Sequence, residues 1–379
     1  MTWYIPFSRL SQTQQGHINR IVKSYRTGTQ YISGFAGSGK SVLLANILER
    51  LRIDNPDASF AFLTYTHSLV GMARTSLQTA GLSAGLANSI RFSTFHSFKK
   101  HNPNVDFVFV DEVQDFEMNW LRTVKEHARY IFLAGDFDQS IYNDTVSKEQ
   151  LFELFSPQTY ELSEVFRLTP SLKKVALSIN PDASRIVEAE AVNSVNADIR
   201  KLIFDSLENE VAWVYKEATG RALAGKPSVI LFSTHKELQR FLRTVANDRK
   251  VPYTGSSGNK DEFYKGMNSH FSGNRIPISF YGNSIGDLGI GDASPHCYVM
   301  TIHSAKGLDF KNVFIPCIAV KNQSFDHRLS FVGVTRSYEN LFLSGTDDEF
   351  SSPFDQLPED VVRVVRPSTE AAGDDAFFF

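Results

Sequence analysis

"GFAGSGKS" (34–41) is the stretch that decides the fold, and it fits the pattern G-x-x-x-x-G-K-[ST]. The apolar run "YIS" (31–33) precedes it, and "SVLLANILERL" (41–51), which has a helical composition, follows. Between a strand and a helix, such a loop turns its backbone N–H groups toward a phosphate. A chance glycine-rich turn is the alternative, and both flanks argue against it. The stretch therefore predicts a phosphate site at a helix N-terminus.

Each residue of this loop has an expected role in that site. Lys40 would neutralise charge on the β- and γ-phosphates, and the Ser41 hydroxyl would bind Mg²⁺. The backbone of the remaining loop residues would wrap the phosphates: Gly34, Ala36, Gly37, Ser38 and Gly39.

Apolar runs alternate with helical segments on both sides of the loop. Continuously apolar strands separated by helices indicate a parallel sheet that is covered on both faces. The alternation occurs twice, so we expect an α/β fold with two such domains. The predicted strands are 31–35, 59–65, 105–111 and 130–136 in the first half, and 228–233, 298–304, 312–320 and 340–345 in the second. The Gly-, Ser- and Asn-rich stretch 253–294 is interpreted as irregular connections.

A second polar group follows the apolar run in "FVFVDEVQD" (107–115). The carboxyl end of a parallel strand is where open α/β sheets bind ligands. Asp111 is therefore expected in the Mg²⁺ shell, and Glu112 is expected to polarise the attacking water. An acidic helix N-terminus is the alternative reading, and the phosphate loop upstream favours the first.

The composition narrows the class of protein. No apolar run approaches the ~20 residues needed to span a bilayer, so we expect no membrane association. The two cysteines are too few for a disulfide framework, which favours a cytoplasmic location. A net charge of −3 means that any nucleic-acid binding would come from a local groove.

Five further motifs follow one another along the chain. They are "TFHSF" (94–98), "DEVQD" (111–115), "GDFDQSIY" (135–142), "VMTIHSAKGLDF" (299–310) and "FVGVTRSYENLFL" (331–343). Together with the loop, they closely resemble the motifs of superfamily 1 helicases of the UvrD/Rep/PcrA branch. The resemblance implies two RecA-like domains with ATP between them and single-stranded DNA across their top. The implied boundaries are 1–168 and 201–366 for the domains, 169–200 for a helical bridge, and 367–379 for a flexible acidic and aromatic tail.

The resemblance also implies roles around the ATP. Gln14 would read the adenine, with Gln15 as the fallback, and Phe166 would stack on the base unless it packs in the core. Arg167 and Arg336 would reach the γ-phosphate, where a guanidinium fork fits phosphate oxygens. Gln139 would bridge the γ-phosphate or water to a moving domain. Gly307 and Lys306 would lie at the domain interface. Asp309 would accept from the nucleotide sugar or from interface arginines.

The implied nucleic-acid track consists of hydroxyl, imidazole and phenol groups. Hydroxyl and imidazole groups would contact phosphates, and Tyr65 would stack on a base. An ordinary hydrogen bond at a strand end is the alternative for each Thr and His. Because most contacts go to the backbone, these motifs do not distinguish DNA from RNA. The residues are Thr64, Tyr65, Thr66, Thr94, His96, Thr301 and His303.

The sequence departs from the family pattern in two places. Only "KKHNPNVDFVF" (99–109) joins "TFHSF" to "VDEVQD" (110–115), so the large insertion of the first domain is absent, and little room remains for the second. After "QSIY" the family continues with a stacking aromatic, whereas here "NDTVSKEQ" (143–150) follows. Both departures favour an alternative function, a nucleotide-driven switch without processive unwinding. The C-terminal "DDAFFF" (374–379) loosely resembles an acidic, Phe-ended tail that docks on a partner protein.

Overall fold

The fold is described from a computed structural model. It describes residues 4–79, 88–101, 103–142, 144–166, 168–183, 186, 190–191, 194–255, 260–282, 297–319 and 325–367. These residues form two compact units. Unit 1 comprises the described residues of Met1–Arg167 and Arg185–Asn193, and unit 2 those of Leu168–Ser184, Ser194–Ile285 and Ser294–Phe379. The domain boundaries expected from the sequence remain predictions.

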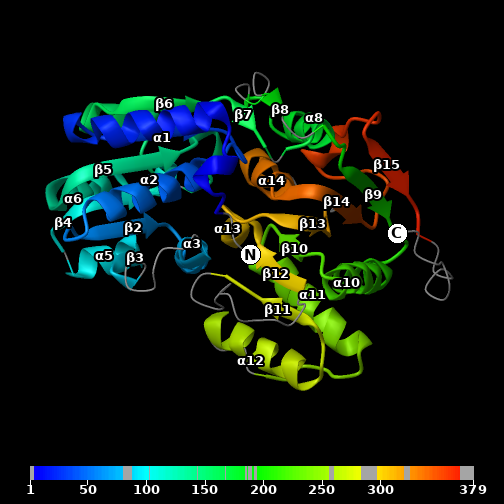
Figure 1. Ribbon diagram of the computed structural model, residues 1–379. Helices are drawn as coiled ribbons and strands as arrows, with labels where there is room; N and C mark the ends of the chain where they lie inside the picture. Colours follow the sequence, from blue (N-terminus) through cyan, green and yellow to red (C-terminus); the bar gives the residue numbers. More distant parts are fainter. Residues whose placement is uncertain are drawn as a thin grey trace. The chain divides into compact units, whose positions relative to one another are not determined.

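Unit 1 is built on a six-stranded sheet in the order β3-β2-β4-β5-β1-β6, with every pair of neighbours parallel (Figure 1). The strands are β1 (Gln30–Gly34), β2 (Phe60–Thr64), β3 (Ile90–Thr94), β4 (Val105–Val110), β5 (Ala128–Gly135) and β6 (Gln158–Leu162). A separate parallel pair joins β7 (Glu164–Val165) to β8 (Glu190–Ala191). β1 and β2 are buried along their whole length, as the apolar runs of the sequence predicted.

Helices cover both faces of this sheet. One face packs against α1 (Gln12–Ser24), α2 (Lys40–Asp54) and α3 (His67–Thr79), and the other against α5 (Phe95–His101), α6 (Met118–His127) and α7 (Lys148–Phe155). Side chains alternate between the faces, so Phe107 and Phe109 meet α2 while Val108 and Val110 meet α6. In Figure 1, α1 and α2 lie side by side. Short 3-10 turns occur at Phe7–Arg9, Tyr25–Thr27, Val113–Asp115 and Phe137–Gln139.

Unit 2 contains a seven-stranded parallel sheet in the order β11-β12-β10-β13-β14-β9-β15. The strands are β9 (Asp198–Ile203), β10 (Ser228–Phe232), β11 (Ile278–Phe280), β12 (Cys297–Thr301), β13 (Phe310–Ile315), β14 (Ser337–Gly345) and β15 (Val362–Val365). The predicted α/β fold with two mostly parallel, helix-covered sheets is confirmed.

The helices of unit 2 form two groups. A large core joins the sheet to α10 (Leu207–Leu223), α11 (His235–Asp248) and α12 (Lys260–Gly273). A second group packs together and consists of α8 (Pro170–Ile179), α13 (Ile302–Ala305) and α14 (His327–Val334). A further 3-10 turn spans Phe354–Gln356. No helix in the described ranges combines the length and the apolar character needed to cross a membrane.

One interpretation of the sequence was wrong. The stretch 253–294 was expected to be irregular, but it contains α12 and β11. Phe263, Met267 and Phe271 recur every four residues and are buried in the core of unit 2. Apolar residues at this spacing line one face of a helix. The Gly, Ser and Asn residues between them hid the periodicity.

Candidate nucleotide site

The polar residues predicted in the first half of the chain gather at one edge of the first sheet. Because β1, β2, β3, β4 and β5 are all parallel, their carboxyl ends lie along the same edge. In the register of β4 and β5, Val110 pairs with Leu133, so the residues that follow both strands are neighbours. The loop 34–41 follows β1 next to β5. The fold therefore brings together segments that are about 70 and 100 residues apart in the chain.

Three glycines shape the phosphate loop. Gly37 and Gly39 have φ values of 76° and 91°, which side-chain-bearing residues rarely adopt. A Cβ on Gly34 would lie 2.5 Å from Ser38 Oγ, and one on Gly39 would lie 2.7 Å from Gln14 Nε2. Ala36 is buried beside them. The glycines are therefore required by the backbone and by close approaches.

Lys40 folds back over the loop. Its Nζ donates to the carbonyl oxygens of Gly34 and Phe35, at 3.0 and 2.9 Å. The ammonium group is buried, so these carbonyls offset part of the cost of removing it from water. Phosphate oxygens would bind the same ammonium more strongly than the neutral carbonyls do.

Ser41 and Asp111 bring two side-chain oxygen atoms together. Ser41 Oγ donates to Asp111 Oδ2 at 2.6 Å, and the N–H of Glu112 donates to Asp111 Oδ1 at 3.0 Å. Burial, with the nearby Glu112 carboxylate, raises the pKa of Asp111 to about 7. Hard oxygen donors of this kind suit Mg²⁺. Three convergent His, Cys, Asp or Glu side chains do not occur in the described part of the chain, so a cation here would complete its shell with nucleotide oxygens and water.

Glu112 and Gln139 are joined through residues that the sequence reading did not single out. Gln114 Nε2 donates to Glu112 Oε2 at 2.5 Å, and the N–H of Asp136 donates to Gln114 Oε1 at 3.0 Å. Asp136 Oδ2 then accepts from Gln139 Nε2 at 2.6 Å. Gly135 permits this approach, because a Cβ there would lie 2.6 Å from Gln114 Oε1. The sequence feature that could have predicted these contacts is the apolar strand before each of the two acidic segments.

Gln14 and Phe166 both reach the phosphate loop. Gln14 Nε2 donates to the carbonyl oxygen of Ser38 at 3.1 Å, and Gln14 Oε1 accepts from the N–H of Ser11 at 3.2 Å. The N–H of Phe166 donates to the carbonyl oxygen of Gly37 at 3.1 Å, and its side chain is half-buried. Gln15 turns its amide to the carbonyl oxygen of Leu10 instead, at 2.9 Å. Arg167 lies outside the described residues.

The nucleic-acid residues predicted in unit 1 lie further along the same edge. Thr64 Oγ1 donates to the carbonyl oxygen of Thr66, whose own hydroxyl accepts from the N–H of Leu69 at 3.3 Å. Thr94 is buried at the end of β3. The hydroxyls of Thr64 and Thr66 therefore already bond within the turn that they occupy, which is the alternative considered for them.

An aromatic group stands beside these hydroxyls. The ring of Tyr65 lies 4.4 Å from that of Tyr142 and 6.2 Å from that of Trp120, centroid to centroid. His96 is exposed and meets the edge of Trp120 at 4.6 Å. Burial raises the pKa of Tyr65, and the neighbouring Asp115 and Glu117 carboxylates add to this shift. The group offers aromatic surface at the edge where "QSIY" ends.

The site residues predicted in unit 2 fall at two different edges of its sheet. Thr301 ends β12 and caps the following turn by accepting from the N–H of Ser304 at 3.2 Å, and His303 lies in that turn. Burial lowers the pKa of His303, which the Asp326 carboxylate partly opposes. Asp309 precedes β13 and Arg336 precedes β14, so both lie at the amino edge.

Arg336 is buried within unit 2. Its guanidinium donates to the carbonyl oxygens of Val332 and Leu308, at 2.9 and 3.2 Å, and to the Thr335 hydroxyl at 3.1 Å. Gly307, with φ of 79°, forms the turn that presents Leu308. These contacts fix the guanidinium at the amino edge of the sheet.

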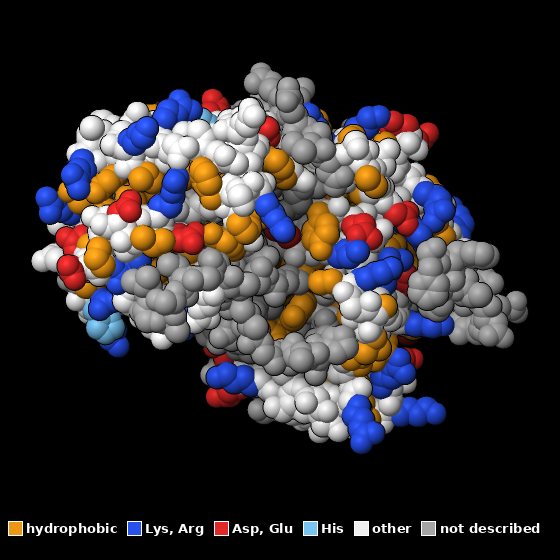
Figure 2. Space-filling view, in the orientation of Figure 1, with side chains coloured by type: hydrophobic (Ala, Val, Ile, Leu, Met, Phe, Trp, Pro, Cys, Tyr) orange, Lys and Arg blue, Asp and Glu red, His pale blue; other side chains and the backbone are white. Residues whose placement is uncertain are grey.

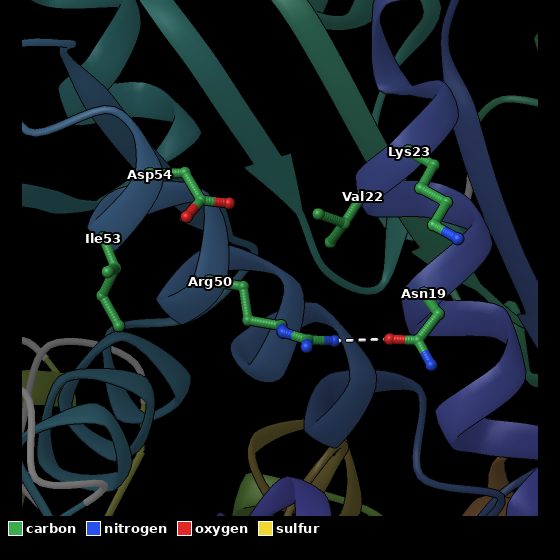
Figure 3. A pocket seen from close by; sticks show the side chains of 6 residues that line it. All are labelled: Asn19, Val22, Lys23, Arg50, Ile53 and Asp54. Carbon is green, nitrogen blue, oxygen red and sulfur yellow. Dashed lines mark hydrogen bonds between the residues drawn. The ribbon is translucent and has the colours of Figure 1, made fainter.

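A hollow of about 310 Å³ lies elsewhere in unit 1, between α1 and α2 (Figure 3). Arg50 Nη1 donates across this hollow to Asn19 Oδ1 at 2.6 Å. At 1.5 Å of rise per residue, Arg50 is about 15 Å along α2 from Lys40. The hollow is therefore separate from the phosphate loop. On the face in Figure 2, outside the residues drawn in grey, Lys and Arg side chains are interspersed with Asp and Glu over both units.

The parallel sheet, the glycine turn before α2 and the Ser41–Asp111 pair define unit 1 as a nucleotide-binding domain of the P-loop class. The chain belongs to the AAA domain family, whose model matches residues 9–198. The UvrD-like helicase C-terminal domain matches residues 296–344. Both matches confirm the resemblance to UvrD-like superfamily 1 helicases. No curated protein matches the sequence.

Three solved structures are similar to this chain. The Arterivirus nonstructural protein 10 (helicase) is 16% identical, with a TM-score of 0.47, and its complex with DNA is 16% identical, with a TM-score of 0.46. The PRRSV helicase is 13% identical, with a TM-score of 0.46. These alignments cover 89%, 89% and 90% of this chain. The chain spans 63%, 64% and 57% of the length of those proteins.

Proposed function

We propose that this chain is a helicase-like motor that hydrolyses ATP with Mg²⁺ and moves along single-stranded DNA. The observation that carries the proposal is the single edge of unit 1 at which Lys40, the Ser41–Asp111 pair and Glu112 meet. These are the residue types that NTP hydrolysis requires at a P-loop. The match to the UvrD-like helicase C-terminal domain supports coupling to nucleic acid.

Each group has a chemical task in this proposal. Lys40 would exchange its two carbonyl partners for β- and γ-phosphate oxygens. Ser41 and Asp111 would hold Mg²⁺, which would offset charge on those oxygens. Glu112 would orient the attacking water and take up its proton, and Gln139 would sense the γ-phosphate.

The remaining proposed residues act on the γ-phosphate or on the rest of the nucleotide. Arg336 and Arg167 would stabilise the charge that spreads over the γ-phosphate oxygens in the transition state. Gln14 and Phe166 would hold the adenine beside the loop, and Gly307 and Asp309 would complete the nucleotide side of unit 2. Changes in this site as ATP is hydrolysed would drive steps along the strand.

The proposed nucleic-acid contacts come from both units. Hydroxyl and imidazole groups would bind the backbone, and Tyr65 would stack on a base, a contact worth about 1–3 kcal/mol. RNA would satisfy the same backbone contacts, and 3′-to-5′ polarity is an expectation from the family. A cytoplasmic location and a protein partner for the acidic tail belong to the same proposal. The tail beyond Pro367 lies outside the described residues.

One feature favours the alternative of a nucleotide-driven switch that binds a DNA structure or a protein without processive unwinding. The family's stacking aromatic is missing after "QSIY", and Asp144 in the same turn is exposed, with φ of 60°. An acidic side chain there would repel a phosphate backbone, most strongly at low salt.

ATP hydrolysis measured with and without single-stranded DNA or RNA, followed by strand displacement on a tailed duplex, tests the proposal. We expect DNA to stimulate hydrolysis and Lys40→Ala and Glu112→Gln to abolish it. Stimulation without strand displacement would favour translocation alone. If no nucleic acid changes the rate, the motor is ruled out and the switch remains. Wild-type hydrolysis in Lys40→Ala would show that the P-loop assignment is wrong.

A further inference from the structure

Gln114 lies inside unit 1 between two segments that are both expected to act on the γ-phosphate. It is fully buried, in the 3-10 turn Val113–Asp115 after β4. We propose that Gln114 is a positioning residue that holds the Glu112 carboxylate for hydrolysis and ties it to the turn that carries Gln139. The inference rests on the proposed NTP hydrolysis and adds a residue to which that proposal gives no role.

The amide of Gln114 is fixed in one orientation by its partners. A backbone N–H can only donate, so the N–H of Asp136 at 3.0 Å must face Gln114 Oε1. A carboxylate can only accept, so Glu112 Oε2 at 2.5 Å must face Gln114 Nε2. If the amide were reversed, its NH₂ group would face the N–H of Asp136 and its oxygen would face the Glu112 carboxylate. The side chain therefore acts as a strut of defined direction.

The backbone on both sides is adapted to this strut. Glu112 has φ of 55°, a left-handed conformation that costs a non-glycine residue of order 1–3 kcal/mol. On the facing strand, a Cβ at Gly135 would lie 2.6 Å from Gln114 Oε1 and 2.7 Å from Val113 Cγ1. The strained backbone at Glu112 and the close approach at Gly135 both indicate a fixed contact between the segments that follow β4 and β5.

The strut continues to Gln139. Asp136 Oδ2 accepts from Gln139 Nε2 at 2.6 Å, and Asp136 Oδ1 accepts from the N–H of Asp138 at 3.2 Å. A shift of Gln139 toward a γ-phosphate would therefore pull on Asp136, whose N–H is bonded to Gln114. Through Gln114, the position of Glu112 would depend on whether the γ-phosphate is present.

Replacing Gln114 with Glu separates its two contacts. The new carboxyl keeps an acceptor for the N–H of Asp136, but when ionised it loses the donor to Glu112 and repels it. When protonated, its O–H can donate to Glu112 again. Two adjacent carboxyl groups share a proton more readily than isolated ones do, so this recovery falls at a raised pH.

Other charged groups lie near Glu112 and residue 114, and they are the same in wild type and in Gln114→Glu. Asp111, which follows β4, and Lys40 on α2 lie on one side. Asp115 and Tyr142 lie on the other, where burial and the nearby carboxylates raise the pKa of Tyr142. Asp136 stands at the end of β5. A difference in pH profile between wild type and Gln114→Glu therefore reports the added carboxyl.

The experiment measures the kcat and KM of ATP hydrolysis from pH 6 to 9. For Gln114→Glu we expect kcat at pH 8 to fall on the order of 10²-fold, as a misplacement of about 1 Å costs, with KM changed less than about threefold. Toward pH 6 its kcat should rise relative to wild type. Gln114→Met, which lacks both polar contacts, should lose kcat without any recovery at low pH.

Gln150→Glu is the matched control, because it makes the same charge change at an exposed position of α7. Its capping box with Ser147 accepts Glu as well as Gln. We expect this variant to keep the wild-type rate and pH profile. If Gln114→Glu also follows the wild-type profile, or if Gln114→Met hydrolyses ATP normally, the positioning role is ruled out. A wild-type protein that hydrolyses no nucleotide would overturn the proposed function itself.

Discussion

The two units use the same architecture but distribute their polar residues differently. In unit 1, the phosphate loop, Asp111, Glu112 and Gln139 all follow the carboxyl ends of parallel strands at a single edge. Hydrogen bonds link them there, in part through Gln114 and Asp136. In unit 2, Thr301 lies at the carboxyl edge, whereas Arg336 lies at the amino edge. A strand of five or six residues separates such edges by about 17–20 Å.

This difference indicates which unit would bind the nucleotide under the proposed function. Unit 1 brings together Lys40, the Ser41–Asp111 pair and Glu112, which are the groups proposed to bind phosphate, hold Mg²⁺ and orient water, and they bond within the unit. The edge residues of unit 2 bond to their own backbone, as the Arg336 guanidinium does. We therefore expect unit 1 to bind nucleotide by itself and unit 2 to contribute to the rate of hydrolysis.

The largest expected effect concerns Arg336 and tests whether unit 2 contributes to the rate of hydrolysis and not to nucleotide binding. Arg336→Lys should lower the rate of ATP hydrolysis on the order of 10³-fold, because arginines at a γ-phosphate contribute that much. Nucleotide affinity should stay within about threefold, since the binding groups belong to unit 1. Single-turnover hydrolysis and nucleotide titration separate the two quantities. A wild-type rate together with a lower Tm would assign Arg336 a purely structural role through Val332 and Leu308.

Paired glycine substitutions test how tightly each unit is packed. Gly135→Ala should destabilise unit 1 by about 1–3 kcal/mol, because its Cβ would overlap Gln114 and Val113. Gly220→Ala in α10 is the matched change in unit 2, where nothing lies within 4 Å of the new Cβ. It should stabilise its helix by about 0.5–1 kcal/mol. Denaturant unfolding measures both, and equal effects would remove this contrast between the units.

The sequence predicted the strands that are apolar throughout, and these hold the P-loop and the acidic segments. It missed β3, in which Arg91 and Ser93 interrupt the apolar pattern, and α12, in which small polar residues mask the spacing. The positions of Gln114 and Asp136 follow from the pairing of β4 with β5, which joins residues 22 positions apart. Such contacts depend on register, which local propensity does not encode.

A buried carboxyl in unit 2 provides a pH test. Glu210 Oε1 accepts from the N–H of Cys317 at 2.8 Å and from Ser344 Oγ at 2.6 Å, and burial raises the pKa of Glu210. The folded protein therefore holds this proton at pH values where the unfolded chain has lost it. Its contribution to stability is present below the unfolded pKa and is lost as pH rises through the folded pKa.

Glu210→Gln removes this dependence and keeps the acceptor oxygen. We expect the variant to exceed wild type in Tm by roughly 2–4 °C at pH 8, as about 1 kcal/mol gives in a unit of this size, with a smaller difference at pH 5. Asp111→Asn offers the comparison in unit 1, where burial also raises the pKa. Thermal unfolding at both pH values measures the effect. A difference in Tm that does not change with pH would show that Glu210 does not titrate across this range.

The smallest expected effect concerns Gln14, whose amide is bonded to Ser11 and Ser38 but still has a second N–H and a second lone pair. Gln14→Ala should raise the KM for ATP a few-fold, on the order of 1 kcal/mol for a lost hydrogen bond. If Gln14 reads adenine, the KM for GTP changes less, and the preference for ATP narrows. If Gln14 only braces the phosphate loop, both values rise equally. Gln15→Ala is the control, because its amide turns to Leu10 instead, and a larger effect there would transfer the base contact to Gln15. Since Gln14 and the loop belong to one unit, a base preference carried by Gln14 would show that unit 1 selects its nucleotide without unit 2.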